Sequence, residues 1–151
     1  MRAVLDSNVL ARAVYSVGGP AEEAVRRLRA PPHVLIVSEF ILVELRRVLH
    51  YPRLRQVHGF DDGKIEAVVA AIEPFAAIVE MREEDVVRVV PHDPDDDHIV
   101  AAAVVSGADV LCTRNRHFYH ESVVAYGRQH AFEILDDIEL LRRLREAESQ
   151  A

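Results

Sequence analysis

The chain has 151 residues, a length that predicts a single domain over residues 1–151 with a sizeable core. Half of its residues are hydrophobic, which excludes a disordered tail. The net charge of −7 does not favour nucleic-acid binding by overall attraction, although arginines or a bound divalent cation can reverse the sign at one site.

Three further features of the composition restrict the class of protein. The chain has no apolar window long enough to span a membrane and no leader of charged then apolar residues, which predicts a cytoplasmic protein without membrane association. A single cysteine, Cys112, excludes a disulfide framework or a cysteine zinc site within one chain. Lys64 is the only lysine, which excludes any mechanism that needs a second one.

Short apolar strands alternate with helices along the chain. Two residues define helix starts: Ser38 is expected to cap the second helix, and Asp93 to cap a helix that opens at Pro94. Continuously apolar strands in such an order are typical of a parallel sheet covered on both faces. The sequence therefore predicts the α/β class, as a three-layer α/β/α sandwich with a central, mainly parallel sheet. The predicted strands are 2–6, 33–37, 76–81, 109–113 and 132–135, and the predicted helices are 20–30, 39–50, 62–73, 94–107 and 138–147.

Polar residues collect where predicted strands end. Asp6 and Asn8 follow the first strand, and "TRN" (113–115) follows the fourth. Asp97 lies in the first turn of the helix that begins in "PHDPDDDHIVAAAVV". Loops and helix N-termini converge at the carboxyl edge of a parallel sheet, so these side chains are expected to meet there. Glu44 lies mid-helix after the second strand and reaches this edge only if its helix crosses it.

Each of these residues has a plain structural explanation when it is taken alone. Asp6 could simply end a strand, Glu44 could face solvent, and Asn115 could occupy a turn. The aspartates at positions 93, 95 and 96 could stabilise a helix dipole by about 0.3–1 kcal/mol each. Taken together, converging acids repel by up to about 4 kcal/mol per close pair at an effective dielectric near 20. A hard divalent cation, Mg²⁺ or Mn²⁺, is the economical way to relieve that repulsion, although Arg114 offers another.

Four segments carry a family resemblance. "VLDSNVL", "VSEFILVELRRVL", "DPDDDHIVAAAVVSGADVLCT" and the following "RN" resemble the PIN domain, and more narrowly its branch of toxin components of toxin–antitoxin pairs. PIN domains are metal-dependent ribonucleases with an α/β/α fold and three or four acids at the strand ends. The resemblance implies that Asp6, Glu44 and Asp97 are the catalytic acids that bind Mg²⁺ or Mn²⁺. Asp97 is preferred because it precedes "HIVAAA" as the family's acid precedes its small-residue helix, with Asp93 and Asp96 as neighbours.

The sequence departs from the family at one position. The fourth acid usually follows a threonine in a Thr-x-Asp pattern, and this chain has Asn115 there. An amide oxygen can bind a metal-held water but carries no charge, which predicts a weaker second metal site. Thr113 and Asn115 are expected to position a water or the scissile phosphate, and Asn8 to orient the metal-binding group. Three arginines are candidates for contacts with the RNA backbone: Arg12, Arg114 and Arg116.

The resemblance also implies partners, namely an RNA substrate, a cognate antitoxin protein, and a second copy of the chain in a homodimer or higher homo-oligomer. The alternative is a catalytically weak PIN fold that binds RNA or protein, which Asn115 favours and the acid set opposes. A receiver domain requires a lysine late in the chain, and Lys64 is in the wrong half. A haloacid-type phosphatase requires Asp-x-Asp near the start, and "DSN" lacks the second acid.

Histidines also gather near the proposed site. The spacing of His117 and His120 has no matching second pair, so it is a poor zinc signature. Surface or turn positions are expected for these two residues and for His92 and His98.

Overall fold

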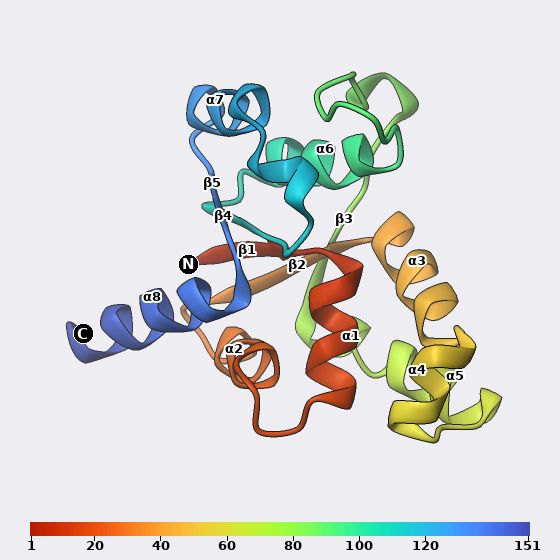
Figure 1. The fold of residues 1–151 in the computed structure, drawn as a ribbon. Coiled ribbons are helices and arrows are strands. Elements are labelled where there is room, and N and C mark those ends of the chain that lie inside the picture. Colours follow the sequence, from red (N-terminus) through yellow and green to blue (C-terminus); the bar gives the residue numbers. More distant parts are fainter.

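The computed structural model describes residues 1–151 and contains one five-stranded sheet (Figure 1). The strand order is β3-β2-β1-β4-β5, and every neighbouring pair is parallel. The predicted α/β class with a parallel central sheet is therefore confirmed. The strands are β1 (Arg2–Leu5), β2 (Val34–Ser38), β3 (Ala76–Val79), β4 (Val110–Cys112) and β5 (Glu133–Leu135).

Helices cover both faces of the sheet. Figure 1 shows α6 and α7 on one side and α1, α2 and α8 on the other, which gives the three layers expected from the sequence. The sequence pattern did not predict α1, α4 or α7. None of the helices is both long and apolar enough to cross a membrane. The helices are α1 (Ser7–Tyr15), α2 (Pro20–Leu28), α3 (Glu39–Leu49), α4 (Pro52–His58), α5 (Asp62–Ala70), α6 (Asp96–Ser106), α7 (Glu121–Gln129) and α8 (Asp137–Ser149).

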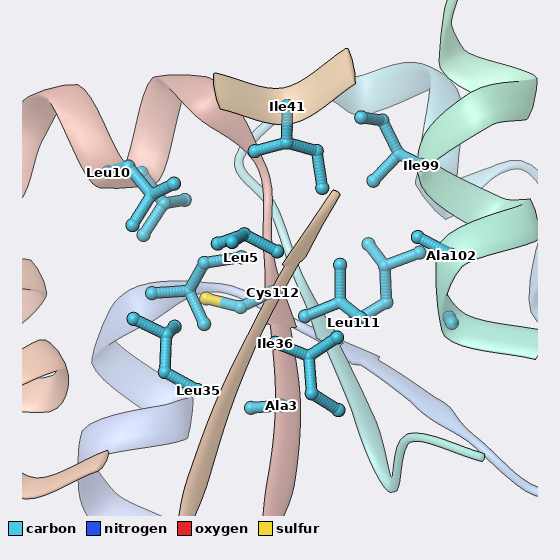
Figure 2. Close-up of a cluster of buried hydrophobic side chains, with 14 of the residues drawn as sticks. Ala3, Leu5, Leu10, Leu35, Ile36, Ile41, Ile99, Ala102, Leu111 and Cys112 are labelled. Carbon is cyan, nitrogen blue, oxygen red and sulfur yellow. The ribbon is translucent and has the colours of Figure 1, made fainter. Parts of the chain in front are cut away.

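The core lies on both sides of the central strands because these strands are apolar at consecutive positions. Leu111 and Cys112 are both fully buried although they point to opposite faces. Figure 2 shows Leu111 on the side of Ile99 from α6, and Cys112 on the side of Leu10 from α1. Burying each large aliphatic side chain stabilises the fold by about 1.5–3 kcal/mol. This two-sided packing fixes the sheet edge at which β1 and β4 end together.

Two predicted helix starts had different outcomes. The capping of α3 is confirmed, since Ser38 Oγ accepts the N–H of Ile41 at 3.2 Å. The predicted start of α6 at Pro94 is wrong, because the helix begins two residues later at Asp96. Asp93 and Pro94 instead form a turn, in which Asp93 Oδ1 accepts the N–H of Asp95 at 3.0 Å. Asp-Pro initiates turns as readily as helices, so the pattern alone could not place this boundary.

Candidate active site

Asp6 and Glu44 meet at the carboxyl end of β1 through a serine. Asp6 is 3 % exposed, directly after β1 and before α1. The hydroxyl of Ser7 lies 2.7 Å from Glu44 Oε1 and 3.3 Å from Asp6 Oδ1. The hydroxyl of Thr113, at the end of β4, donates to Asp6 Oδ2 at 2.8 Å. Glu44 therefore does reach this edge, because α3 packs against α1.

Asp96 is the acid of α6 that faces this group. Asn115 follows β4, and its amide nitrogen donates to Asp96 Oδ2 at 3.1 Å. His117 Nδ1 lies 3.7 Å from the same oxygen. Negative charge on both Asp6 and Glu44 contributes to a raised pKa of Asp96, so the three carboxylates share one electrostatic environment. We call Asp6, Glu44 and Asp96 the acid cluster.

Asp97, which the sequence pattern favoured, has different partners. Its Oδ1 accepts the backbone N–H groups of Val89 and Val90 at 2.9 and 2.8 Å, and Arg88 donates to its Oδ2 at 2.7 Å. Its carboxylate is thus occupied in holding the segment before α6. Adjacent residues of an α-helix point about 100° apart, and here Asp96 bonds to Asn115 while Asp97 bonds to the segment before α6. The geometry favours Asp96 over Asp97 as the third acid.

All three members of the acid cluster hold protons more tightly than usual. Burial is the main cause of the raised pKa of Asp6, which hydrogen bonds from Thr113 and Ser7 partly oppose. Burial also raises the pKa of Glu44, and repulsion from Asp6 adds to it. The pKa of Asp96 rises to about 7, first through burial and then through repulsion by neighbouring carboxylates. The chain supplies no arginine or lysine as an ion-pair partner to this cluster.

The side chains of the protein do not form a complete metal-binding site as they stand. No three His, Cys, Asp or Glu side chains are close enough together to hold an ion as they stand. The donor chemistry nevertheless fits a hard cation, since the carboxylates of the cluster repel one another and the nearby charges of Arg47 and His117 offset this repulsion only in part. Mg²⁺ keeps several water ligands and needs only one or two direct carboxylates, so it tolerates such spacing better than Zn²⁺.

The other predicted residues are polar residues close to the acid cluster and three arginines. Asn8 is exposed on α1, and its backbone lowers the pKa of Asp6; Asp93 lies close enough to raise the pKa of Asp96. The backbone N–H of Asn115 donates to Thr113 Oγ1 at 3.0 Å, which fixes the loop after β4. Of the predicted arginines, Arg12 and Arg114 approach a buried aspartate, whereas Arg116 is exposed and pairs with no acid.

That buried aspartate is Asp137, which the sequence analysis missed. It is fully buried at the start of α8, and Arg114 Nε donates to its Oδ1 at 2.6 Å. Arg12 Nε lies 3.9 Å from its other oxygen. "LDD" after the fifth strand was a usable signal, because it places acids at the same sheet edge. Ser7 was also missed, and "LDSN" gave no indication that its hydroxyl would join two carboxylates.

The sheet, the covering helices and the acids that α3, α6 and the end of β1 bring to one edge define an α/β/α domain with a polar site at that sheet edge. The family model described as "PIN domain" matches residues 2–117, and the chain belongs to this family. No curated protein matches the chain in sequence.

A solved structure agrees with the chain over most of its length. It is the crystal structure of VapBC2 from Rickettsia felis bound to a DNA fragment from the promoter. The match has a TM-score of 0.61 and 13 % identity, and it covers 90 % of this chain and 98 % of the other. At that identity the likeness establishes the shared fold.

Proposed function

We propose that this protein is a metal-dependent ribonuclease, the PIN-domain toxin of a toxin–antitoxin pair, which hydrolyses RNA phosphodiester bonds in the cytoplasm. The observation that carries the proposal is the acid cluster, in which Asp6, Glu44 and Asp96 approach one another without a cationic side chain between them. Such an arrangement costs stability unless a cation offsets it. Family membership supports a nuclease, and the charge pattern supports one that uses a divalent ion.

The acid cluster would hold Mg²⁺ or Mn²⁺, directly or through water, with Asp96 in the place that the sequence pattern gave to Asp97. When bound, such an ion supplies an activated water and offsets negative charge on the phosphodiester. The chain itself orients the acids. Ser7 and Thr113 donate hydroxyl hydrogen bonds to Glu44 and Asp6, and these bonds limit the rotation of both carboxylates.

Asn115 positions Asp96 in this proposal. Its amide nitrogen donates to the carboxylate, while its side-chain oxygen accepts the N–H of His117 at 3.0 Å. One residue thereby connects the acid of α6 to the turn after β4. The amide supplies no charge of its own, so the site is expected to bind one ion tightly rather than two.

A groove beside α3 supports the proposed antitoxin partner. It has a volume of about 700 Å³, and its walls include the exposed apolar residues Val43 and Ile78. Val43 directly precedes Glu44 on α3, so the groove lies along the helix that supplies one member of the acid cluster. Three glutamates, Glu39, Glu80 and Glu83, also line the groove and favour a partner segment that is basic as well as apolar. The VapBC2 structure is of a toxin–antitoxin complex, which is consistent with such a partner.

The second candidate is a PIN fold that binds RNA or protein without cleaving it. Asn115 in place of an acid favours this function, since it reduces the negative charge available to a metal. The two candidates differ in one simple observation, because a binding module has no need for a divalent ion.

The test is cleavage of a fluorescent single-stranded RNA by the purified chain with Mn²⁺, with Mg²⁺ and with EDTA. We expect cleavage with either ion and none with EDTA, and we expect Asp6→Asn to remove it while the variant still unfolds cooperatively in urea. Cleavage that persists in EDTA or in Asp6→Asn would exclude this mechanism.

A further inference from the structure

A second polar hollow opens beside the acid cluster, and cationic or neutral side chains line it. Its volume is about 450 Å³. None of its lining residues is acidic, although the chain as a whole carries a charge of −7. We call this hollow the histidine pocket; it is lined by Pro91, His92, Arg116, His117, Tyr119 and His120.

The pocket lies between the turn after β4 and the segment before α6. Tyr119 donates its hydroxyl hydrogen to the carbonyl of Thr113 at 2.8 Å, which ties the turn after β4 to the strand. His92 has a φ of 78°, a left-handed conformation that is uncommon for residues with a side chain. Its ring centroid lies 5.9 Å from that of His117, so the two segments face each other across the pocket.

The lining groups are donors suited to an anion. Arg116 is exposed and pairs with no carboxylate, unlike Arg12 and Arg114, which approach Asp137. His120 accepts the N–H of Ser122 on Nδ1 at 3.2 Å, so its Nε2 carries the proton when the ring is neutral. A guanidinium with several imidazole donors is a favourable set for a phosphate group.

The pocket also lies next to the proposed reaction site. His117 belongs to both, because it lines the pocket and its Nδ1 is 3.7 Å from Asp96 Oδ2. A strand whose scissile phosphate lay at the acid cluster would therefore pass this pocket with a neighbouring phosphate. A negatively charged protein needs such a local cationic contact to hold a polyanion.

We propose that the histidine pocket binds a phosphate of the nucleic-acid strand next to the scissile bond, and that Arg116 and His92 are the residues that hold it. This inference rests on the proposed function, since it assigns a substrate-binding position to the same site. The recognised group is the phosphodiester, so the contact itself does not distinguish RNA from DNA.

The binding test uses full-length Asp6→Asn protein in EDTA, so that no cleavage occurs, with a short fluorescein-labelled single-stranded RNA followed by anisotropy. Arg116→Ala with His92→Asn alters the pocket, and asparagine tolerates the left-handed conformation at position 92. Arg128→Ala with His130→Asn is the matched control, because it makes the same changes at the far end of α7, where both residues are exposed.

We expect the pocket substitutions to weaken RNA binding about tenfold and to reduce the slope of log K against log salt by about 0.7, the value for one phosphate contact on a single strand. The control should bind as the parent does. The same loss with a single-stranded DNA probe is expected, because the phosphate is common to both. An equal loss in the pocket and control proteins would overturn the inference, since it would reflect overall charge alone.

Cleavage by the otherwise wild-type protein separates this inference from the proposed function. With Mn²⁺, the pocket substitutions should raise KM about tenfold and leave kcat within a few-fold, as loss of a uniform binding contact does. Unchanged KM and unchanged RNA affinity would overturn the pocket and leave the nuclease function intact. A wild-type protein that neither binds nor cleaves RNA would overturn both.

Discussion

The buried acid Asp137 and the acid cluster lie at the same sheet edge, and the fold provides them with different partners. Asp137 is fully buried, but Arg114 donates to it and Arg12 approaches it. Asp6 and Asp96 are almost as buried, and the chain gives them hydroxyl and amide donors but no arginine or lysine.

We infer from this contrast that Asp137 is a structural acid and that the acid cluster is the functional site. Burying a charge without a partner costs free energy, which the fold avoids at Asp137 and accepts in the acid cluster. The raised pKa values in the cluster are the consequence. Strongly shifted groups that gather at a strand-end site are typical of functional sites.

The neighbours Asp96 and Asp97 offer the largest expected difference. Asp96→Asn should reduce Mn²⁺-dependent RNA cleavage by about a hundredfold or more, the scale for losing one preorganised electrostatic group, with little loss of stability. Asp97→Ala should instead lower the free energy of unfolding by about 2–4 kcal/mol, because the N–H groups of Val89 and Val90 lose their acceptor. Cleavage assays and urea unfolding measure the two effects. The reverse pattern would return the catalytic role to Asp97.

Asp137 is the buried acid whose charge is paired with an arginine, and substituting it tests that half of the comparison. Asp137→Asn keeps an oxygen for Arg114 but removes the buried charge, and we expect it to lower the free energy of unfolding by about 1–3 kcal/mol. Cleavage at a temperature where the variant is folded should stay within a few-fold of wild type. Glu121→Gln, at an exposed acid in the first turn of α7, is the control and should lower the free energy of unfolding by no more than about 0.3–1 kcal/mol, because it loses only its interaction with the helix dipole. A hundredfold loss of cleavage in folded Asp137→Asn would place this residue in the active site.

The dependence of stability on pH tests the acid cluster, whose carboxylates form no ion pair with an arginine or lysine. The pKa of Asp96 is raised from 3.8 to about 7, so between these two pH values the folded chain keeps a proton that the unfolded chain releases. The stability from Asp96 is therefore fully present below pH 3.8 and is lost as the pH rises through 7. In EDTA, wild type should lose more stability than Asp96→Asn over this range in urea titrations. Parallel curves for the two proteins would show that Asp96 titrates normally.

The smallest effect is expected at Asn115. Asn115→Asp keeps the acceptor for the N–H of His117 but replaces the hydrogen bond to Asp96 by repulsion. Without metal the variant should be slightly less stable than wild type, and with Mn²⁺ it should cleave RNA a few-fold faster, because a fourth acid strengthens metal binding. Equal stability with and without Mn²⁺ in this variant would show that position 115 lies outside the metal site.

The sequence predicted the sheet well because apolar runs such as those of β2 and β4 are a local signal. It also offered Asp6 as a site candidate, because Asp6 follows a strand, and Glu44, through the resemblance to the PIN domain. It could not separate Asp96 from Asp97. That distinction depends on the residue at which α6 begins, and a run of aspartates after a turn leaves the helix start undefined. The sequence could not predict the partners of Asp137 either, because Arg12 and Asp137 are far apart in the sequence and meet only in the folded chain.

Calorimetric titration with Mn²⁺ at neutral pH measures whether Asp6, Glu44 and Asp96 together bind one divalent ion. We expect wild type and Asp97→Asn to bind Mn²⁺ with similar affinity, whereas Asp6→Asn and Asp96→Asn should bind it at least about tenfold more weakly, a change of about 1.4 kcal/mol. Wild-type protein that gives no heat of binding, or Asp96→Asn that binds as wild type does, would contradict binding by these three acids together.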